Sequence, residues 1–207
     1  MHMYVSKEKI DNAINVFQRH GGILRTSEAL DAGIYRRTLY HMEEEGLLTK
    51  LERGVYKLSD TDMLANPDLT IVAKKVPKAR ICLISALDFH GITTEIPHEV
   101  HIALPRTSRD PKLDHPPLQV YRFSGDSLTK GIEKHKVDGV EVQVYNPAKT
   151  IADCFKFRNK IGLDIAMEAL EQGIKQGKAS YSDILKYAEI CRVKSVIKPY
   201  MEAIAHG

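Results

Sequence analysis

Glycine spacing in the first sixty residues constrains the fold more than any other feature of this sequence. It divides the stretch into short segments, with glycines at positions 21, 22, 33, 46 and 54. Ahead of the first pair, apolar residues recur at helical spacing, which predicts a helix with one buried stripe: Ile10, Ala13, Ile14 and Phe17. A second helix is expected to start near Thr26–Ser27, where a hydroxyl suits an N-cap, and to stop at Gly33.

The third predicted helix runs from Tyr35 to about Glu45 and has two distinct faces. We expect one face to be core: Tyr35, Leu39 and Met42. The other is polar: Arg36, Arg37, Tyr40, His41 and Glu44. Residues 47–51 and 55–58 then have the pattern of strands joined by a glycine-containing turn. Two helices, a glycine turn, a basic helix and a hairpin, in this order, predict a winged helix-turn-helix over residues 1–60.

This motif places its third helix in the DNA major groove, where arginine can form paired hydrogen bonds to guanine O6 and N7. We therefore expect four residues to reach the major groove: Arg36, Arg37, Tyr40 and His41. Four others are expected to contact phosphates or the minor groove: Arg25, Thr38, Lys50 and Arg53. Exposed arginines are often only solvated charge, and winged helices also serve as protein-binding modules. Residues 1–60 hold nine Lys and Arg against nine Asp and Glu, so binding would depend on where the charges lie.

Composition sets broad limits. The 207 residues suffice for one small and one medium domain, and 43% of them are hydrophobic, as in ordinary globular proteins. No apolar run approaches the roughly 20 residues needed to span a bilayer, and the N-terminus lacks the pattern of a secretory signal. The three cysteines are widely spaced and form no metal or disulfide pattern. These features favour a cytoplasmic protein, and the net charge of +3 is too small to imply nucleic-acid binding by itself.

After an expected linker at residues 61–69, the segment 70–207 has an α+β pattern. The sheet is expected to be small and mixed or antiparallel, with a helical bundle at the C-terminal end. Expected helices are 78–90, one that Asn146 caps ahead of Pro147, 163–176, 180–190 and 193–205, and expected strands are 99–104, 118–123 and 140–145, with 136–137 as a possible partner. On the helix after Asn146, one face is apolar and the opposite face is expected to be an exposed polar stripe: Lys149, Asp153, Lys156 and Lys160. Three of these residues are cations, and Arg158 lies nearby. Such a stripe is ordinarily just solvated surface.

Several segments in unbroken order resemble the AbiEi family, which comprises antitoxins and transcriptional repressors of AbiE-type, type IV toxin-antitoxin systems: Gly54–Leu58, Leu83–Ile92, Ile96–Pro105, Val120–Gly125 and Tyr145–Gly162. The resemblance implies that the N-terminal domain binds inverted repeats in its own promoter. It also implies that residues 70–207 form an antitoxin domain, which counters a nucleotidyltransferase-type toxin without a stable complex. We take the cationic residues Lys149, Lys156, Arg158 and Lys160 as the candidate antitoxin patch. No cofactor is expected.

Enzymatic alternatives find little support in the sequence. His98 and His101 have a His-x-x-His spacing, but on a strand they would point to opposite faces, so we expect no metal site. Asp138 and Glu141 resemble part of a nuclease motif, yet Gln143 stands where such a motif needs a lysine. We therefore expect no enzyme. Two alternatives stay open: a metabolite-responsive regulator with a ligand pocket in the second domain, and an enzyme carried on a DNA-binding module.

Overall fold

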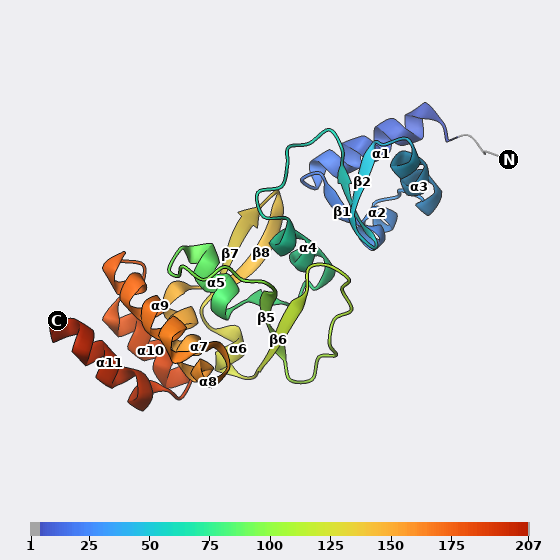
Figure 1. Cartoon of the computed structure of the whole chain (residues 1–207). Coiled ribbons are helices and arrows are strands. Elements are labelled where there is room, and N and C mark those ends of the chain that lie inside the picture. The colour runs from blue at the N-terminus through green and yellow to red at the C-terminus, as the bar shows by residue number, and fades with distance from the viewer. Residues whose placement is uncertain (1–4, 207) are drawn as a thin grey trace. The chain divides into compact units, whose positions relative to one another are not determined.

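The computed structural model describes residues 5–206, which form two compact units (Figure 1). The N-terminal unit contains residues up to 77 together with 112–116 and 136–142, and the C-terminal unit contains 78–111, 117–135 and the residues from 143 onward. This division differs from the expected boundary at residues 69 and 70. The reason is that a helix begins at Pro67, inside the expected linker, continues to Lys75, and packs against the strands of the N-terminal unit. No helix within residues 5–206 is both long and apolar enough to cross a membrane.

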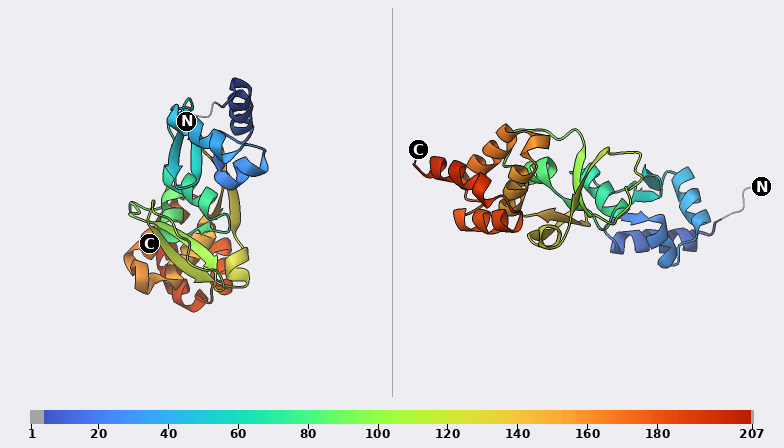
Figure 2. Two further views of the ribbon diagram at one scale, coloured as in Figure 1. Left: turned by 90° about the vertical axis from the view of Figure 1, so that its right-hand side faces the viewer. Right: turned by 90° about the horizontal axis from the view of Figure 1, so that it is seen from below.

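Helices pack against a small antiparallel sheet in the N-terminal unit (Figure 2). Its elements are α1 (Lys7–Arg19), β1 (Ile23–Arg25), α2 (Thr26–Asp31), α3 (Arg36–Glu44), β2 (Leu48–Glu52), β3 (Val55–Leu58) and α4 (Pro67–Lys75). The strand order is β1-β3-β2, with Leu24 opposite Tyr56 and Lys50 opposite Tyr56 on the other side. The three helices and the hairpin predicted from the sequence are therefore present. β1 and α4 are additional. A three-residue strand such as β1 is too short to show periodicity, and the first residues of α4 belong to the segment expected as a linker.

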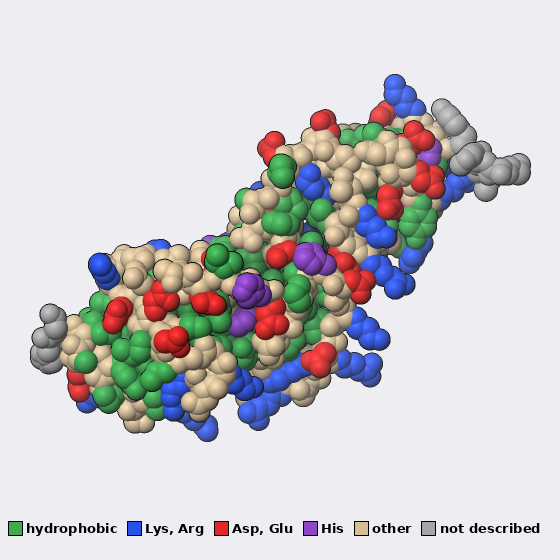
Figure 3. Space-filling model, in the orientation of Figure 1, with side chains coloured by type: hydrophobic (Ala, Val, Ile, Leu, Met, Phe, Trp, Pro, Cys, Tyr) green, Lys and Arg blue, Asp and Glu red, His purple; other side chains and the backbone are tan. Residues whose placement is uncertain are grey.

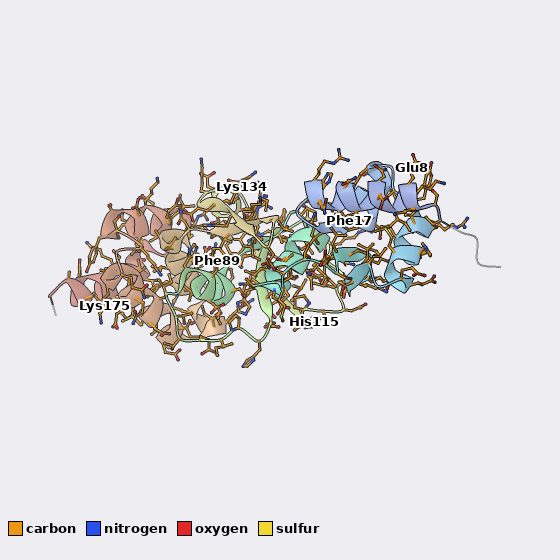
Figure 4. All side chains as sticks on the ribbon, turned by 90° about the horizontal axis from the view of Figure 1, so that it is seen from above. Glu8, Phe17, Phe89, His115, Lys134 and Lys175 are labelled. Carbon is orange, nitrogen blue, oxygen red and sulfur yellow. The ribbon has the colours of Figure 1, made fainter. Side chains whose placement is uncertain are left out.

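The core of the N-terminal unit lies between α1, α3 and the sheet. Phe17 on α1, which Figure 4 labels, is fully buried. Leu39 and Met42 on α3 are fully buried as well. Tyr35, which we expected in this core, is instead 70% exposed, because it is the residue before α3 and lies outside the helical periodicity. The N-cap of α2 is Arg25 rather than a hydroxyl residue, and its backbone N–H donates to Glu28 Oε2 over 2.7 Å. Burial of the apolar stripes fixes the face that α3 presents to solvent.

Asp138 fixes the start of α4. Its carboxylate accepts hydrogen bonds from the backbone N–H groups of Ala65 and Asn66 and from the Thr70 hydroxyl, at 2.8 to 3.0 Å. Next to it, Gly21 and Gly139 lie so close that a Cβ on Gly21 would come within 2.7 Å of the Gly139 carbonyl oxygen. Only glycine fits this approach, because neighbouring backbone cannot move aside cheaply. The hairpin tip at 136–142 is thereby part of the N-terminal unit.

A five-stranded mixed sheet and a group of helices make up the C-terminal unit (Figure 1). The elements are β4 (Arg80–Ile81), α5 (Leu83–His90), β5 (Val100–Pro105), β6 (Leu118–Phe123), α6 (Asp126–Thr129), β7 (Ile132–Val137), β8 (Val140–Tyr145), α7 (Pro147–Lys156), α8 (Arg158–Ile161), α9 (Leu163–Lys175), α10 (Tyr181–Ile190) and α11 (Lys194–His206). The order is β6-β5-β4-β8-β7, in which β5 and β6 are parallel, β4 and β8 are parallel, and β4 and β5 are antiparallel. The sheet was expected to be mixed or antiparallel, and it is mixed.

The expected helix at 78–90 is wrong in its first part. Arg80 and Ile81 form β4, which pairs with β5 on one side and β8 on the other. Only α5, from Leu83, is helical, and Gly91 ends it in the left-handed conformation at φ 61°. A two-residue central strand gives no periodic signal, so the apolar residues of both elements merge into one apparent helix.

α7 departs most from expectation, because it is buried around most of its surface. Residues 148–155 are all buried, and α5, α9 and α10 pack against this helix. Lys149 and Asp153, placed on an exposed stripe by the sequence, are fully buried. They form an ion pair with each other, and the Lys149 ammonium lies 4.1 Å from the ring centroid of Tyr145. Periodicity identified the apolar face correctly but could not show that helices cover the polar face as well.

His101 on β5 supplies a pH-dependent term in the stability of the C-terminal unit. It is 6% exposed, and its Nδ1 has no hydrogen-bond partner within residues 5–206. Burial lowers the pKa of His101 to about 4. The unfolded chain takes up a proton near pH 6.5, well before the folded chain does, so stability falls as the pH drops from about 6.5 to about 4. Between pH 7.5 and pH 5, we expect this residue to account for a loss of roughly 2 kcal/mol.

Urea unfolding of wild type and of His101→Gln at both pH values measures this term. The variant should lose less stability than the wild type on acidification. His98→Gln, which changes an exposed histidine nearby, should keep the wild-type pH dependence. Equal pH dependence for wild type and His101→Gln would show that the buried ring makes no such contribution.

Candidate nucleic-acid interface

The first turn of α3 presents an exposed set of aromatic and cationic side chains. Arg36 and Arg37 are both exposed, and both follow directly from the helix N-cap at Tyr35. Tyr40, one turn later, is 48% exposed. The prediction that Arg36, Arg37 and Tyr40 face solvent is confirmed. Tyr35 belongs to the same exposed surface at 70%, and the signal that sequence reasoning missed is its position just outside the helix.

Two other predicted contact residues on α3 are less accessible. Thr38 is only 4% exposed, and its backbone N–H donates to the Tyr35 carbonyl at 2.9 Å. The expectation that its side chain reaches a phosphate is therefore wrong in this structure, since Thr38 faces the core beside Leu39. His41 is half-buried. The candidate surface of α3 thus consists of its first turn and Tyr40, with His41 at the margin.

The hairpin tip offers a second exposed cation. Arg53 and Lys50 are both exposed, and Gly54 takes a left-handed φ of 76° at the turn. The tip is anchored from two directions: the Thr26 N–H donates to the Gly54 carbonyl at 2.9 Å, and Lys75 Nζ donates to the Arg53 carbonyl at 2.6 Å. The backbone that carries the Arg53 side chain is consequently held against α2 and α4.

Arg25, the remaining predicted contact residue, is half-buried at the start of α2. The Glu28 carboxylate that accepts its backbone N–H also pairs with Lys74 Nζ at 3.0 Å. This arrangement ties the start of α2 to α4. Glu28 is thereby partly neutralised, which lowers the negative potential at this end of α2.

Acidic residues near the end of α3 could oppose the approach of an anion, and one of them is engaged elsewhere. Glu43 accepts a hydrogen bond from the Tyr56 phenol, and Tyr56 is only 4% exposed. Burial, together with the Glu43 carboxylate, raises the pKa of Tyr56, so this phenol remains a donor at neutral pH. Glu44 and Glu45 are exposed. Figure 3 shows Lys and Arg interspersed with Asp and Glu over the visible face, as expected for a nearly neutral chain.

The cationic residues predicted for the C-terminal unit do not form one stripe. Lys149 is fully buried, so its assignment to the candidate antitoxin patch is wrong. Lys156 and Lys160 are exposed. Arg158 is half-buried and donates from Nη1 to the Phe155 carbonyl at 2.8 Å, so it acts partly as a cap for α7. The patch is therefore reduced to Lys156 and Lys160, with Arg158 beside them.

Metal ligation finds no support among residues 5–206, where no group of three or more His, Cys, Asp or Glu side chains could hold an ion. His98 is exposed and lies ahead of β5, whereas His101 is buried on that strand, so the two were not placed on opposite faces of one strand as expected. The three cysteines are free and buried.

Comparison with known proteins adds two findings. Residues 13–58, which extend from α1 to β3, match the family described as "Transcriptional regulator, AbiEi antitoxin", and over these residues the match agrees with the resemblance seen in the sequence. No curated protein matches the chain. The chain resembles the crystal structure of RV2827C protein from Mycobacterium tuberculosis, with a TM-score of 0.54 and 13% identity, over 98% of this chain and 82% of that chain. At that identity the likeness shows a similar fold only.

Proposed function

We propose that this chain, whose residues 13–58 match the AbiEi antitoxin family of transcriptional regulators, is a DNA-binding autorepressor and antitoxin of a type IV system. In this proposal the N-terminal unit is a winged helix-turn-helix, in which α3 is the recognition helix and the β2–β3 hairpin is the wing. The observation that carries it is the exposed pair Arg36 and Arg37 on the first turn of α3. No catalytic step is assigned to the chain, and its place of action is taken to be the cytoplasm.

Recognition would follow from the geometry of α3. The first turn of a recognition helix lies nearest the base edges, where Arg36 and Arg37 could each pair with a guanine. Tyr35 and Tyr40 add flat apolar surface next to the arginines, which suits contact with thymine methyl groups or sugar. The anchored hairpin tip would place Arg53 on the backbone or in the minor groove, and thus fix the register.

A gel shift with the DNA immediately upstream of the protein's own start codon tests the repressor part. We expect specific binding that survives an excess of unrelated DNA, because base contacts add to the salt-dependent phosphate attraction. Equal affinity for upstream and unrelated DNA would contradict the proposal.

Lys50 distinguishes phosphate contacts from base contacts. It is exposed on β2, in the wing, where a single cation would neutralise one phosphate. For Lys50→Gln, we expect the slope of log K against log salt to fall by about one unit, with unchanged preference among operator variants. Titrations at four salt concentrations measure the slope. An unaltered slope, or a changed base preference, would remove Lys50 from the proposed phosphate contacts.

The antitoxin part is assigned to the C-terminal unit, with Lys156 and Lys160 as the exposed cations that counter a nucleotidyltransferase-type toxin without a stable complex. Lys156→Glu/Lys160→Glu should abolish rescue of cells that express the toxin, because the local charge is reversed, and should leave upstream-DNA binding intact. Lys175→Glu/Lys186→Glu makes the same charge change on α9 and α10 and should rescue normally. Full rescue by the first variant would reject the patch. A role in phage defence is part of the same proposal and would require toxin and antitoxin together.

A further inference from the structure

A cleft of about 820 Å³ lies in the C-terminal unit, formed by the end of β6, the end of α7 and the turn between α10 and α11. Cationic side chains dominate its lining, against the single carboxylate of Asp126: Arg106, Arg122, Lys156 and Arg192. All of these residues belong to the C-terminal unit. The cleft therefore concerns a property other than the proposed binding of DNA by α3.

Most of this positive charge is uncompensated. Among residues 5–206, no carboxylate forms an ion pair with Arg106, Lys156 or Arg192. Arg122 does have partners: it donates to the Pro105 carbonyl at 3.1 Å and pairs with Asp110, whose side chain is 80% exposed. Like charges that converge on one cleft repel each other, and a bound anion removes this repulsion. The charge pattern therefore favours an anionic ligand.

One wall of the cleft is aromatic. Phe157 is half-buried, and its ring centroid lies 5.0 Å from that of Tyr121 and 5.4 Å from that of Phe123, which holds the ring in place. The Lys156 ammonium lies 5.5 Å from the Phe123 centroid and 5.8 Å from the Phe157 centroid. The cation of the exposed Lys156 side chain thus lies over a flat aromatic surface. Aromatic surface and cation together suit a planar ring attached to a phosphate.

On the other side of the cleft, hydrogen bonds to buried residues hold the turn between α10 and α11 in place. Cys191 donates from Sγ to Asp153 Oδ1 at 3.2 Å, and Asp153 is paired with the buried Lys149. The Ser127 hydroxyl donates to the Ile190 carbonyl at 3.4 Å, which links α6 to the same turn. Arg192 has a left-handed backbone conformation, φ 60°, that a residue other than glycine adopts only when its surroundings hold it there. The position of the Arg192 side chain on the rim is thereby set in advance of binding.

We propose that this cleft binds a nucleoside di- or triphosphate, with the phosphates among Arg106, Arg122 and Arg192 and the base against Phe157. The volume lies in the range of about 300 to 1,000 Å³ typical of small-molecule sites. Arginine suits the phosphates because its planar guanidinium forms two parallel hydrogen bonds to them. A ligand with several phosphates also matches the excess of positive over negative side chains in the lining.

Calorimetric titration of the full chain with ATP, ADP, adenosine and inorganic phosphate, at low salt, tests the proposal. The key variant is Arg106→Gln/Arg192→Asn, which removes two exposed cations and uses asparagine because it tolerates the left-handed region. Arg109→Gln/Lys186→Gln removes the same charge from exposed positions outside the cleft. We expect ATP and ADP to bind, adenosine at least tenfold more weakly, and the key variant to lose at least tenfold in affinity while the control changes less than twofold.

Three results of the titrations would overturn the proposal, and a fourth would come from a nucleic-acid probe. The first is the absence of ATP and ADP binding up to 1 mM. The second is an equal loss of affinity in the key variant and the control, which would indicate only bulk attraction. The third is binding of adenosine that is as strong as the binding of ATP.

A fluorescent twelve-nucleotide single strand serves as a further probe and should bind no more tightly than ATP. Tighter binding that depends on Arg106 and Arg192 would show that the ligand of the cleft is a nucleic acid and not a small molecule. Neither variant alters α3, so failure here leaves the proposed DNA binding intact.

Discussion

Replacement of Lys149 by methionine should destabilise the folded chain by about 3 to 5 kcal/mol. Methionine keeps the length of the side chain but removes the ammonium that pairs with Asp153, and both residues are fully buried on α7. The variant would leave an uncompensated carboxylate in the core, which is far costlier than the loss of a surface pair. Urea unfolding at pH 7.5 measures the change in the free energy of unfolding.

Two further variants test whether the loss of stability comes from the buried charge pair. Lys156→Met changes an exposed lysine at the end of the same helix, and it should shift stability by no more than about 0.5 kcal/mol. Lys149→Met/Asp153→Leu removes both charges and should recover much of the loss, because no buried charge is then left alone. A value for Lys149→Met that equals the value for Lys156→Met would contradict the buried pair.

The loss in the free energy of unfolding caused by Lys149→Met should also depend on pH, and it should be smaller at low pH. Burial raises the pKa of Asp153, and in the wild type Lys149 opposes that rise. Without the lysine, the pKa of the carboxyl rises further, and the folded variant takes up a proton at a higher pH than the unfolded chain does. Its stability relative to wild type should therefore improve as the pH falls, since protonation removes the buried charge.

The double substitution Arg36→Ala/Arg37→Ala should weaken binding to upstream DNA by about 2 to 6 kcal/mol, or roughly thirtyfold or more. Each arginine that pairs with a guanine contributes about 1 to 3 kcal/mol of discrimination against other bases. Both side chains are exposed on α3, and alanine favours helix, so the fold should be retained. Gel shifts on the upstream fragment and on unrelated DNA give the two affinities.

The matched control for this pair is Lys7→Ala/Lys9→Ala, which removes the same charge from exposed positions on α1. It should reduce affinity for upstream and unrelated DNA alike, and by less. If the arginine variant also weakens both DNAs equally, Arg36 and Arg37 act as general phosphate contacts. Retention of full affinity by the arginine variant would exclude them from the interface.

Local periodicity sufficed to predict most of the N-terminal unit. The stripe that ends in Phe17 and the faces of α3 are set by neighbours three and four residues away, and the glycine turns are visible in the sequence. The exposure of Arg36 and Arg37 follows from the same period. Tyr35 and Thr38 were misplaced because the start of α3, and hence the phase of its faces, depends on cap geometry.

Long-range packing explains what the sequence could not predict. β4 consists of two residues, and it is a strand only because β5 and β8 pair with it from distant parts of the chain. Lys149 lies on the polar face of an amphipathic helix, yet α10 and the aromatic rings of Phe123 and Tyr145 cover it. The cleft at Arg192 likewise brings together side chains from four separate segments, which no local pattern reveals.

Methylation interference on the upstream DNA tests most directly whether the start of α3 occupies the major groove. Methyl groups on guanine N7 lie in that groove, at an atom that arginine would contact. We expect methylation at a few guanines in each half of an inverted repeat to block binding by wild type, and to have much less effect on Arg36→Ala/Arg37→Ala. Interference confined to adenine N3, in the minor groove, or none at any guanine, would contradict recognition by this helix.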